Sequence, residues 1–168
     1  MNPTPNHQDT VRLRASDVET AAYQGLARAV RAAPMPDNQL LAHLPLYLTR
    51  ASMSHILFMS DLYRQVLDVH GDIVEFGTRW GRNLALFLSL RNSLEPHNYT
   101  RRVIGFDTFE GFASLAAEDG SDAILKPGHL AVSAQWEVEL ARLLEHHEAL
   151  APRPALRRFE LVKGDVCQ

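Results

Sequence analysis

A chain of 168 residues with 46% hydrophobic side chains has the size and apolar content of one globular unit. Its formal net charge of −3, with basic residues scattered along the sequence, argues against a nucleic-acid partner. The single cysteine, Cys167, excludes an internal disulfide framework and a CxxC metal site. The polar start and the lack of an apolar run of about 18 residues indicate neither a secretory signal nor a membrane span. We therefore expect a cytoplasmic protein without a nucleic-acid or membrane partner.

The first 70 residues predict an arm followed by helices. Residues 1–15 show no periodicity and predict a flexible arm. Residues 16–70 predict a helical extension, whose first helix should begin after Ser16 because Ser16 and Glu19 form a capping-box pattern. Its last apolar positions recur at helical spacing as far as Gly71, a suitable stop. We expect these helices to pack on a following sheet and to frame the mouth of a site.

Three short apolar runs follow, each ending in or beside a carboxylate. The runs are residues 72–76 with Glu75, 102–107 with Asp107, and 159–163 followed by Asp165. Helical patterns separate them, and a strand, a helix and a strand within about 36 residues predict a right-handed βαβ unit and a parallel sheet. Because ligands bind beyond the carboxyl ends of parallel strands, the three acids should converge on one crevice. Residues 71–168 therefore predict a Rossmann-like α/β domain.

The turn after the first run has the pattern Glu75-x-Gly77-x-x-x-Gly81. Glycine lets a ligand approach the main chain, and the N–H groups of the following helix attract negative charge. A dinucleotide fingerprint would need glycines where Arg79 and Arg82 stand, and the Gly-Lys-Ser/Thr of a P-loop is absent. The pattern resembles a relaxed first motif of class I S-adenosylmethionine-dependent methyltransferases. The alternative is a turn that needs glycine only for its backbone.

The three acids have expected roles in such a site. Asp107 is expected to accept both ribose hydroxyls of a nucleoside, and the alternative is an aspartate that caps its own loop. Asp165 lies where it could meet the adenine edge, unless it is only a turn residue. Glu75 should order the glycine turn and face the methionine amino group or the sulfonium. Its alternative role is a negative charge at the N-terminus of the following helix.

Three motifs together resemble the macrocin O-methyltransferase family, class I enzymes that methylate sugar hydroxyls of natural products. They are Val74–Gly77 with Gly81, Ile104–Phe112, and Leu161–Asp165, and Asp-Thr-Phe-Glu-Gly in the second is the most distinctive part. The resemblance covers roughly residues 50–166 and implies a class I methyltransferase fold. It implies that S-adenosyl-L-methionine binds Glu75, Gly77, Gly81, Asp107 and Asp165, with Thr108 and Phe109 beside the nucleoside. Thr78 and Asn83, from the same turn, are added to the expected cofactor contacts, although Asn83 is peculiar to this turn and is not part of the resemblance.

The resemblance also implies what these 168 residues do not supply. Family members continue through four more strands, which carry acids resembling a magnesium site and the base that acts on the acceptor hydroxyl. We therefore expect an incomplete sheet, a part of a longer enzyme, and doubtful activity of this chain alone. No catalytic residue or metal ligand is assigned, and Mg2+ belongs at most to the complete enzyme. The uncovered edge of the first strand leaves a homo-oligomer open.

The leading hypothesis is the donor-binding part of an O-methyltransferase whose acceptor is a sugar or another small natural product. One alternative is a Rossmann-like module for another adenine nucleotide of the NAD type. Another is a non-catalytic interaction protein with a decayed methyltransferase fold. His146 and His147, flanked by Glu145 and Glu148, predict a solvated helix face rather than a metal site, because adjacent helical residues do not share a face.

Overall fold

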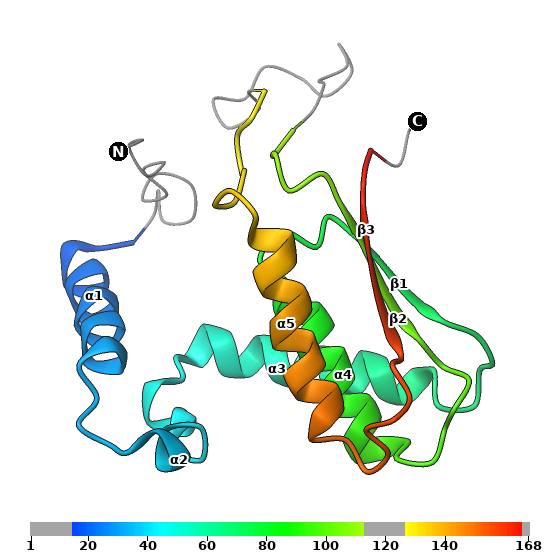
Figure 1. Cartoon of the computed structure of the whole chain (residues 1–168). Coiled ribbons are helices and arrows are strands. Elements are labelled where there is room, and N and C mark those ends of the chain that lie inside the picture. The colour runs from blue at the N-terminus through cyan, green and yellow to red at the C-terminus, as the bar shows by residue number, and fades with distance from the viewer. Residues whose placement is uncertain (1–14, 113–126, 166–168) are drawn as a thin grey trace. The chain divides into compact units, whose positions relative to one another are not determined.

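The computed structural model describes residues 15–112 and 127–165 (Figure 1). The chain divides into two compact units, Met1–Leu57 and Phe58–Gln168, which are taken one at a time below. The boundary near residue 70 that the sequence suggests stays a prediction.

The first unit is helical. It contains α1 (Asp17–Arg31), α2 (Asp37–Leu40), the 3-10 helix η2 (Leu44–Tyr47) and the start of α3 (Arg50–Gln65). The capping box at the start of α1 is confirmed. Ser16 Oγ accepts a hydrogen bond from the Glu19 N–H over 3.3 Å, and Glu19 Oε2 accepts one from the Ser16 N–H over 2.9 Å. Each side chain thus satisfies a backbone donor that the helix leaves without a partner.

Helix α3 ends earlier than the sequence predicts. The apolar spacing suggested a helix up to Gly71, but α3 stops at Gln65. The reason is a buried arginine: Arg101 Nη2 donates to the carbonyls of Val66 and Val69, both over 2.8 Å, and Nη1 donates to the Gly71 carbonyl over 3.0 Å. The guanidinium therefore replaces the helical hydrogen bonds that further turns would have made.

The second unit, which begins at Phe58 within α3, is a parallel α/β sheet (Figure 1). Its elements are β1 (Ile73–Phe76), α4 (Arg82–Leu94), β2 (Val103–Asp107), α5 (Trp136–Ala149) and β3 (Phe159–Lys163). The strand order is β1-β2-β3, and both neighbouring pairs are parallel. The Rossmann-like α/β fold expected from the sequence is confirmed.

Helices α4 and α5 pack against each other and against the sheet (Figure 1). The hydrophobic core of the second unit lies between these helices and the strands. The close approach of α4 depends on Gly105 in β2, where a Cβ atom would lie 2.4 Å from Leu84 Cδ1. The buried core residues are Met59, Tyr63, Leu84, Phe87, Leu88, Val103, Phe109, Val132, Leu140, Leu144 and Phe159. Burial of these side chains supplies the main driving force for folding.

Buried ion pairs lie at the amino-terminal edge of the sheet. Glu148 is 4% exposed and contacts Arg91 at 2.8 Å and Arg158 at 3.6 Å. The predicted solvated helix face is therefore wrong for Glu148, because two arginines from distant segments draw this side chain inward. Nearby, Arg101 pairs with Glu95 at 2.8 Å.

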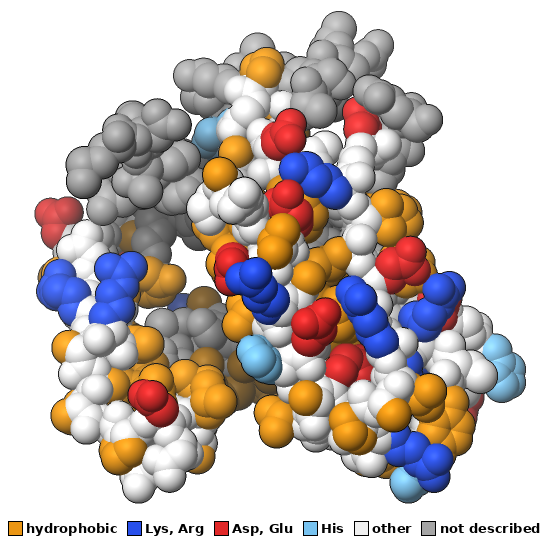
Figure 2. All heavy atoms as spheres, viewed as in Figure 1, with side chains coloured by type: hydrophobic (Ala, Val, Ile, Leu, Met, Phe, Trp, Pro, Cys, Tyr) orange, Lys and Arg blue, Asp and Glu red, His pale blue; other side chains and the backbone are white. Residues whose placement is uncertain are grey.

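The visible surface mixes both signs of charge. Acidic and basic side chains are interspersed over the face of the second unit seen in Figure 2, together with exposed apolar side chains. Val74 and Phe76 of β1 are 46% and 66% exposed, because they alternate with the inward residues Ile73 and Glu75. None of the helices in the described residues is long and apolar enough to cross a membrane.

Candidate functional site

The carboxyl ends of the three strands lie together, as the sequence predicts. The Gly77 N–H donates to the Phe106 carbonyl over 2.9 Å, which fixes the turn after β1 against the end of β2. The Gly164 N–H donates to the Asp107 carbonyl over 3.0 Å, which fixes the end of β3 against β2. Asp165 follows directly and is partly buried. The predicted site residues of the three strands therefore share one edge of the sheet.

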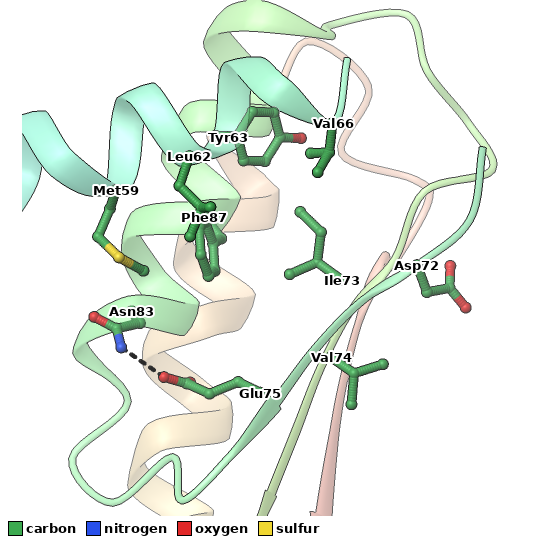
Figure 3. A pocket seen from close by; sticks show the side chains of 10 residues that line it. All are labelled: Met59, Leu62, Tyr63, Val66, Asp72, Ile73, Val74, Glu75, Asn83 and Phe87. Carbon is green, nitrogen blue, oxygen red and sulfur yellow. Dashed lines mark hydrogen bonds between the residues drawn. The ribbon is translucent and has the colours of Figure 1, made fainter. Parts of the chain in front are cut away.

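Glu75 is the most chemically distinctive side chain at this edge (Figure 3). It extends from β1 toward the start of α4, where its Oε1 accepts a hydrogen bond from Asn83 Nδ2 over 2.7 Å. Its Oε2 is buried and has no hydrogen-bond partner among the described residues. Burial raises the pKa of the Glu75 carboxyl, and the Asn83 amide acts in the opposite direction. A buried acceptor of this kind needs a donor, which a bound ligand can supply.

An apolar pocket runs along β1 from this carboxylate. It has a volume of about 400 Å³ and lies between α3, β1 and α4 (Figure 3). Its lining residues are Met59, Leu62, Tyr63, Val66, Asp72, Ile73, Val74, Glu75, Asn83 and Phe87. Because Glu75 and Asn83 come from the end of β1 and the start of α4, they place polar groups at the end of the pocket nearest the glycine turn.

The two glycines of the turn serve different purposes. Both have a φ of +78°, a left-handed conformation that favours glycine. At Gly81 a Cβ atom would lie 2.3 Å from Leu140 Cδ1, so this glycine is needed for the packing of α4 against α5. At Gly77 no atom lies within 4 Å of such a Cβ, and the residue is exposed. Of these two glycines, Gly77 is the one that leaves the main chain open to a ligand.

Asp107 holds two loops in place. Its Oδ2 accepts a hydrogen bond from the Arg79 N–H over 2.7 Å, and its Oδ1 accepts one from the Phe109 N–H over 2.5 Å. Arg79 and Phe109 both have left-handed backbones, with φ of +51° and +59°. The loop-capping alternative is thus realised. It does not exclude a ribose, because a carboxylate has about four acceptor sites and the two N–H groups use two.

The loop after β2 is closed by its own hydrogen bonds. Thr108 Oγ1 donates to the Gly111 carbonyl over 2.8 Å and accepts from the Glu110 N–H over 3.2 Å. The Phe109 ring is 5% exposed and belongs to the hydrophobic core. Of the predicted residues here, Thr108 and Phe109 therefore shape the loop, and the Phe109 backbone N–H is the group that contacts the Asp107 carboxylate.

Thr78 is the remaining predicted residue of the turn. It is 5% exposed, and its hydroxyl makes no hydrogen bond of ordinary geometry with the described residues. The Thr78 hydroxyl nevertheless helps to lower the pKa of Glu75. A Cβ at Gly105 would lie 2.6 Å from Thr78 Oγ1, which shows how tightly this side chain is enclosed.

Sequence reasoning missed several contacts around the turn. The Trp80 and Trp136 rings meet edge to face, with centroids 5.0 Å apart, and join the turn to the start of α5. Lys163 at the end of β3 pairs with Glu137 at 3.2 Å and with Glu110 at 3.5 Å. These partners are far apart in sequence and carry no local signal. Among the described residues, no group of three or more His, Cys, Asp or Glu side chains could hold a metal ion.

Comparisons with known proteins point to methyltransferases. No protein-family model matches the chain, and no curated protein sequence matches it. Solved structures do match it, among them two of CalS11. A crystal structure of CalS11, a calicheamicin methyltransferase, is 40% identical, with a TM-score of 0.87 over 92% of this chain and 60% of that one. An apo structure of CalS11, described as TDP-rhamnose 3'-O-methyltransferase, is 37% identical, with a TM-score of 0.75 over 92% and 58%.

These matches confirm the Rossmann-like methyltransferase fold and the likeness to methyltransferases that the three motifs indicated. They do not favour the NAD-type alternative, and neither names the macrocin family. The chain spans about 60% of the length of the solved structures that it matches.

Proposed function

We propose that the chain binds S-adenosyl-L-methionine and forms the donor-binding part of a sugar O-methyltransferase, related to the macrocin O-methyltransferases. The observation that carries the proposal is the 40% identity to a methyltransferase over 92% of the chain. The cofactor would supply a methyl group on a positively charged sulfur. In the expected reaction the carbon–sulfur bond breaks as a carbon–oxygen bond forms to an acceptor hydroxyl, which loses its proton to a base.

The amino-acid end of the cofactor suits the start of α4. Glu75 Oε2 is a buried acceptor with no partner in the described residues, and an ammonium group would satisfy it. Helix α4 begins after Gly81, which has no side chain to cap it, and the N-terminus of a helix favours the negative charge of a carboxylate. Gly77 leaves room for both to approach the turn.

The nucleoside end suits the edges of β2 and β3. Asp107 keeps acceptor capacity for ribose hydroxyls after binding the N–H groups of Arg79 and Phe109. Asp165 lies one residue beyond Gly164, whose N–H is bonded to Asp107, and is proposed to face the adenine.

The acceptor is proposed to be a sugar hydroxyl, and a nucleoside-diphosphate deoxysugar is the first candidate because one matched protein is a TDP-rhamnose 3'-O-methyltransferase. The base is proposed to come from the part of the enzyme corresponding to the relatives' additional length. The acceptor is tested with an enzyme that includes this part. The measurement is the formation of S-adenosylhomocysteine with TDP-rhamnose as acceptor, compared with free rhamnose. Equal rates would contradict a need for the nucleotide.

Calorimetric titration of the chain with S-adenosylmethionine, S-adenosylhomocysteine and NAD tests the donor site. We expect saturable binding of the first two and none of NAD. Asp107→Ala should weaken binding by at least about tenfold, because a hydrogen bond to a charged group contributes roughly 1.5–3 kcal/mol. Asp61→Ala, which changes an exposed aspartate on α3, is the control. Binding of NAD alone, or no nucleoside binding by the folded chain, would contradict the proposal.

A further inference from the structure

The hydrogen bond between Glu75 and Asn83 connects β1 to the first turn of α4. Asn83 is the second residue of α4, after the left-handed N-cap Gly81. Its side-chain nitrogen lies 2.7 Å from Glu75 Oε1, and both side chains are partly buried (Figure 3). Asn83 is among the cofactor contacts expected from the sequence. The structure instead directs its amide donor to Glu75, so a different role has to be considered.

The surroundings of Glu75 make this donor important. Glu75 forms no ion pair with the residues that the structure describes, and its Oε2 has no hydrogen bond there. Burial has the largest effect on the pKa of Glu75 and raises it. The Asn83 amide and the Thr78 hydroxyl lower that pKa, Asp107 on β2 raises it, and Arg82 on α4 lowers it. Among the α3 residues that line the pocket with Glu75, the titratable one is Tyr63, whose own pKa is raised by burial, so it is neutral there.

We propose that Asn83 is a positioning residue, whose amide holds Oε1 of Glu75 and keeps that carboxylate ionised, so that Oε2 can accept an ammonium group of the ligand. This inference rests on the proposed function, because the ammonium is that of S-adenosylmethionine. Asn83 then acts through Glu75 rather than through its own contact with the cofactor. A hydrogen bond to the charged form of a carboxyl favours ionisation, which gives the proposal a measurable signature in pH.

The signature is the fall in cofactor affinity at low pH, which is the acid limb of a plot of affinity against pH. In the wild-type chain, affinity for S-adenosylhomocysteine should fall as the pH drops through the raised pKa of Glu75, because a neutral carboxyl holds an ammonium poorly. Without the Asn83 amide that pKa rises further, so the limb should move to higher pH. A displacement of one pH unit makes binding about tenfold weaker at a fixed pH below the limb.

The experiment compares dissociation constants for S-adenosylhomocysteine between pH 5.5 and 8.5. Asn83→Leu removes the donor at similar size, Asn83→Gln keeps an amide, and Ser93→Ala changes an exposed position of the same helix. We expect Asn83→Leu to bind within threefold of wild type at pH 8.5, with its acid limb displaced to higher pH. Asn83→Gln should recover at least part of that displacement, and Ser93→Ala should match wild type.

Two results would overturn the proposal. A loss of affinity by the same factor at every pH would mean that Asn83 contacts the cofactor itself or only supports the fold. An unchanged acid limb in Asn83→Leu would mean that Glu75 does not depend on the amide.

A measurement without cofactor separates this inference from the proposed function. Because the pKa of Glu75 is raised on folding, its contribution to stability is present below its unfolded value and is lost as the pH rises to the folded value. Urea unfolding from pH 4 to 8 should show this loss in wild type relative to Glu75→Gln, and a loss that extends to higher pH in Asn83→Leu. If no cofactor binds, the proposed function fails. If the two profiles coincide, the role of Asn83 fails.

Discussion

Charged side chains at the two edges of the β1-β2-β3 sheet differ in their partners. At the amino-terminal edge, Arg101 precedes β2 and lies 2.8 Å from the partly buried Glu95. Arg158 precedes β3 and lies 3.6 Å from the buried Glu148. At the carboxyl-terminal edge, Glu75 and Asp107 form no ion pair with the residues that the structure describes. Asp107 accepts backbone N–H groups instead, and one oxygen of Glu75 accepts nothing.

The difference separates groups that hold the fold from groups that can hold a ligand. Removing one partner of a buried ion pair strongly lowers the stability of the fold, because the other charge is left buried and unpaired. A charge that already has its partner gains no stabilisation from a ligand. A buried acceptor without a donor contributes nothing to the stability of the free protein, and a bound cation can supply the missing hydrogen-bond donor. Substitutions at the two edges should therefore affect different measurements.

The largest effect on stability is expected at Glu148. Glu148→Ala leaves Arg91 and Arg158 buried without the carboxylate that both contact, and the free energy of unfolding should fall by about 3–5 kcal/mol. Urea unfolding measures the change, with Glu145→Ala as the control at an exposed position of the same helix. A loss below about 1 kcal/mol would show that the amino-terminal edge is not held by these pairs.

The second-largest effect on stability is expected at the glycines of the turn, where the two alanine substitutions should lower the free energy of unfolding by different amounts. Gly81→Ala places a Cβ against Leu140 in a left-handed backbone, and should cost about 3 kcal/mol of unfolding free energy. Gly77→Ala has the same φ but open space, and should cost about 1 kcal/mol. Thermal or urea unfolding of both variants measures the difference. Equal losses would mean that packing against α5 does not determine the glycine at position 81.

The smallest effects are expected at the two arginines of the turn. Arg79 has a φ of +51°, so Arg79→Gly should raise the free energy of unfolding by about 0.5 kcal/mol while keeping the N–H that binds Asp107. Arg82 is the first residue of α4, and Arg82→Gly should lower it by about 0.5 kcal/mol. Urea midpoints distinguish the two signs. A loss in Arg79→Gly would show that the Arg79 side chain itself stabilises the turn.

Local signals in the sequence predicted much of this fold. The capping box at Ser16 and the apolar runs that end in Glu75 and Asp107 depend on neighbouring residues, and the structure confirms them. The proximity of the carboxyl ends followed from a parallel sheet.

What the sequence did not predict depends on contacts between distant segments. Glu148 is buried because Arg91 and Arg158 meet it from other elements. Gly81 is needed because Leu140, far along the chain, packs against it. Neither partner has a fixed spacing from the residue that it affects, so no local pattern indicates it.

The most direct test of the account is a backbone amide NMR titration of the chain with S-adenosylhomocysteine. Chemical shifts should change in the turn at residues 77–83 and in the loop at residues 107–111, where Glu75 and Asp107 converge. The amides around Arg101 and Arg158 at the opposite edge should stay unchanged. Shifts concentrated at that opposite edge, or none at millimolar ligand in the folded chain, would contradict a donor site at the carboxyl ends of the strands.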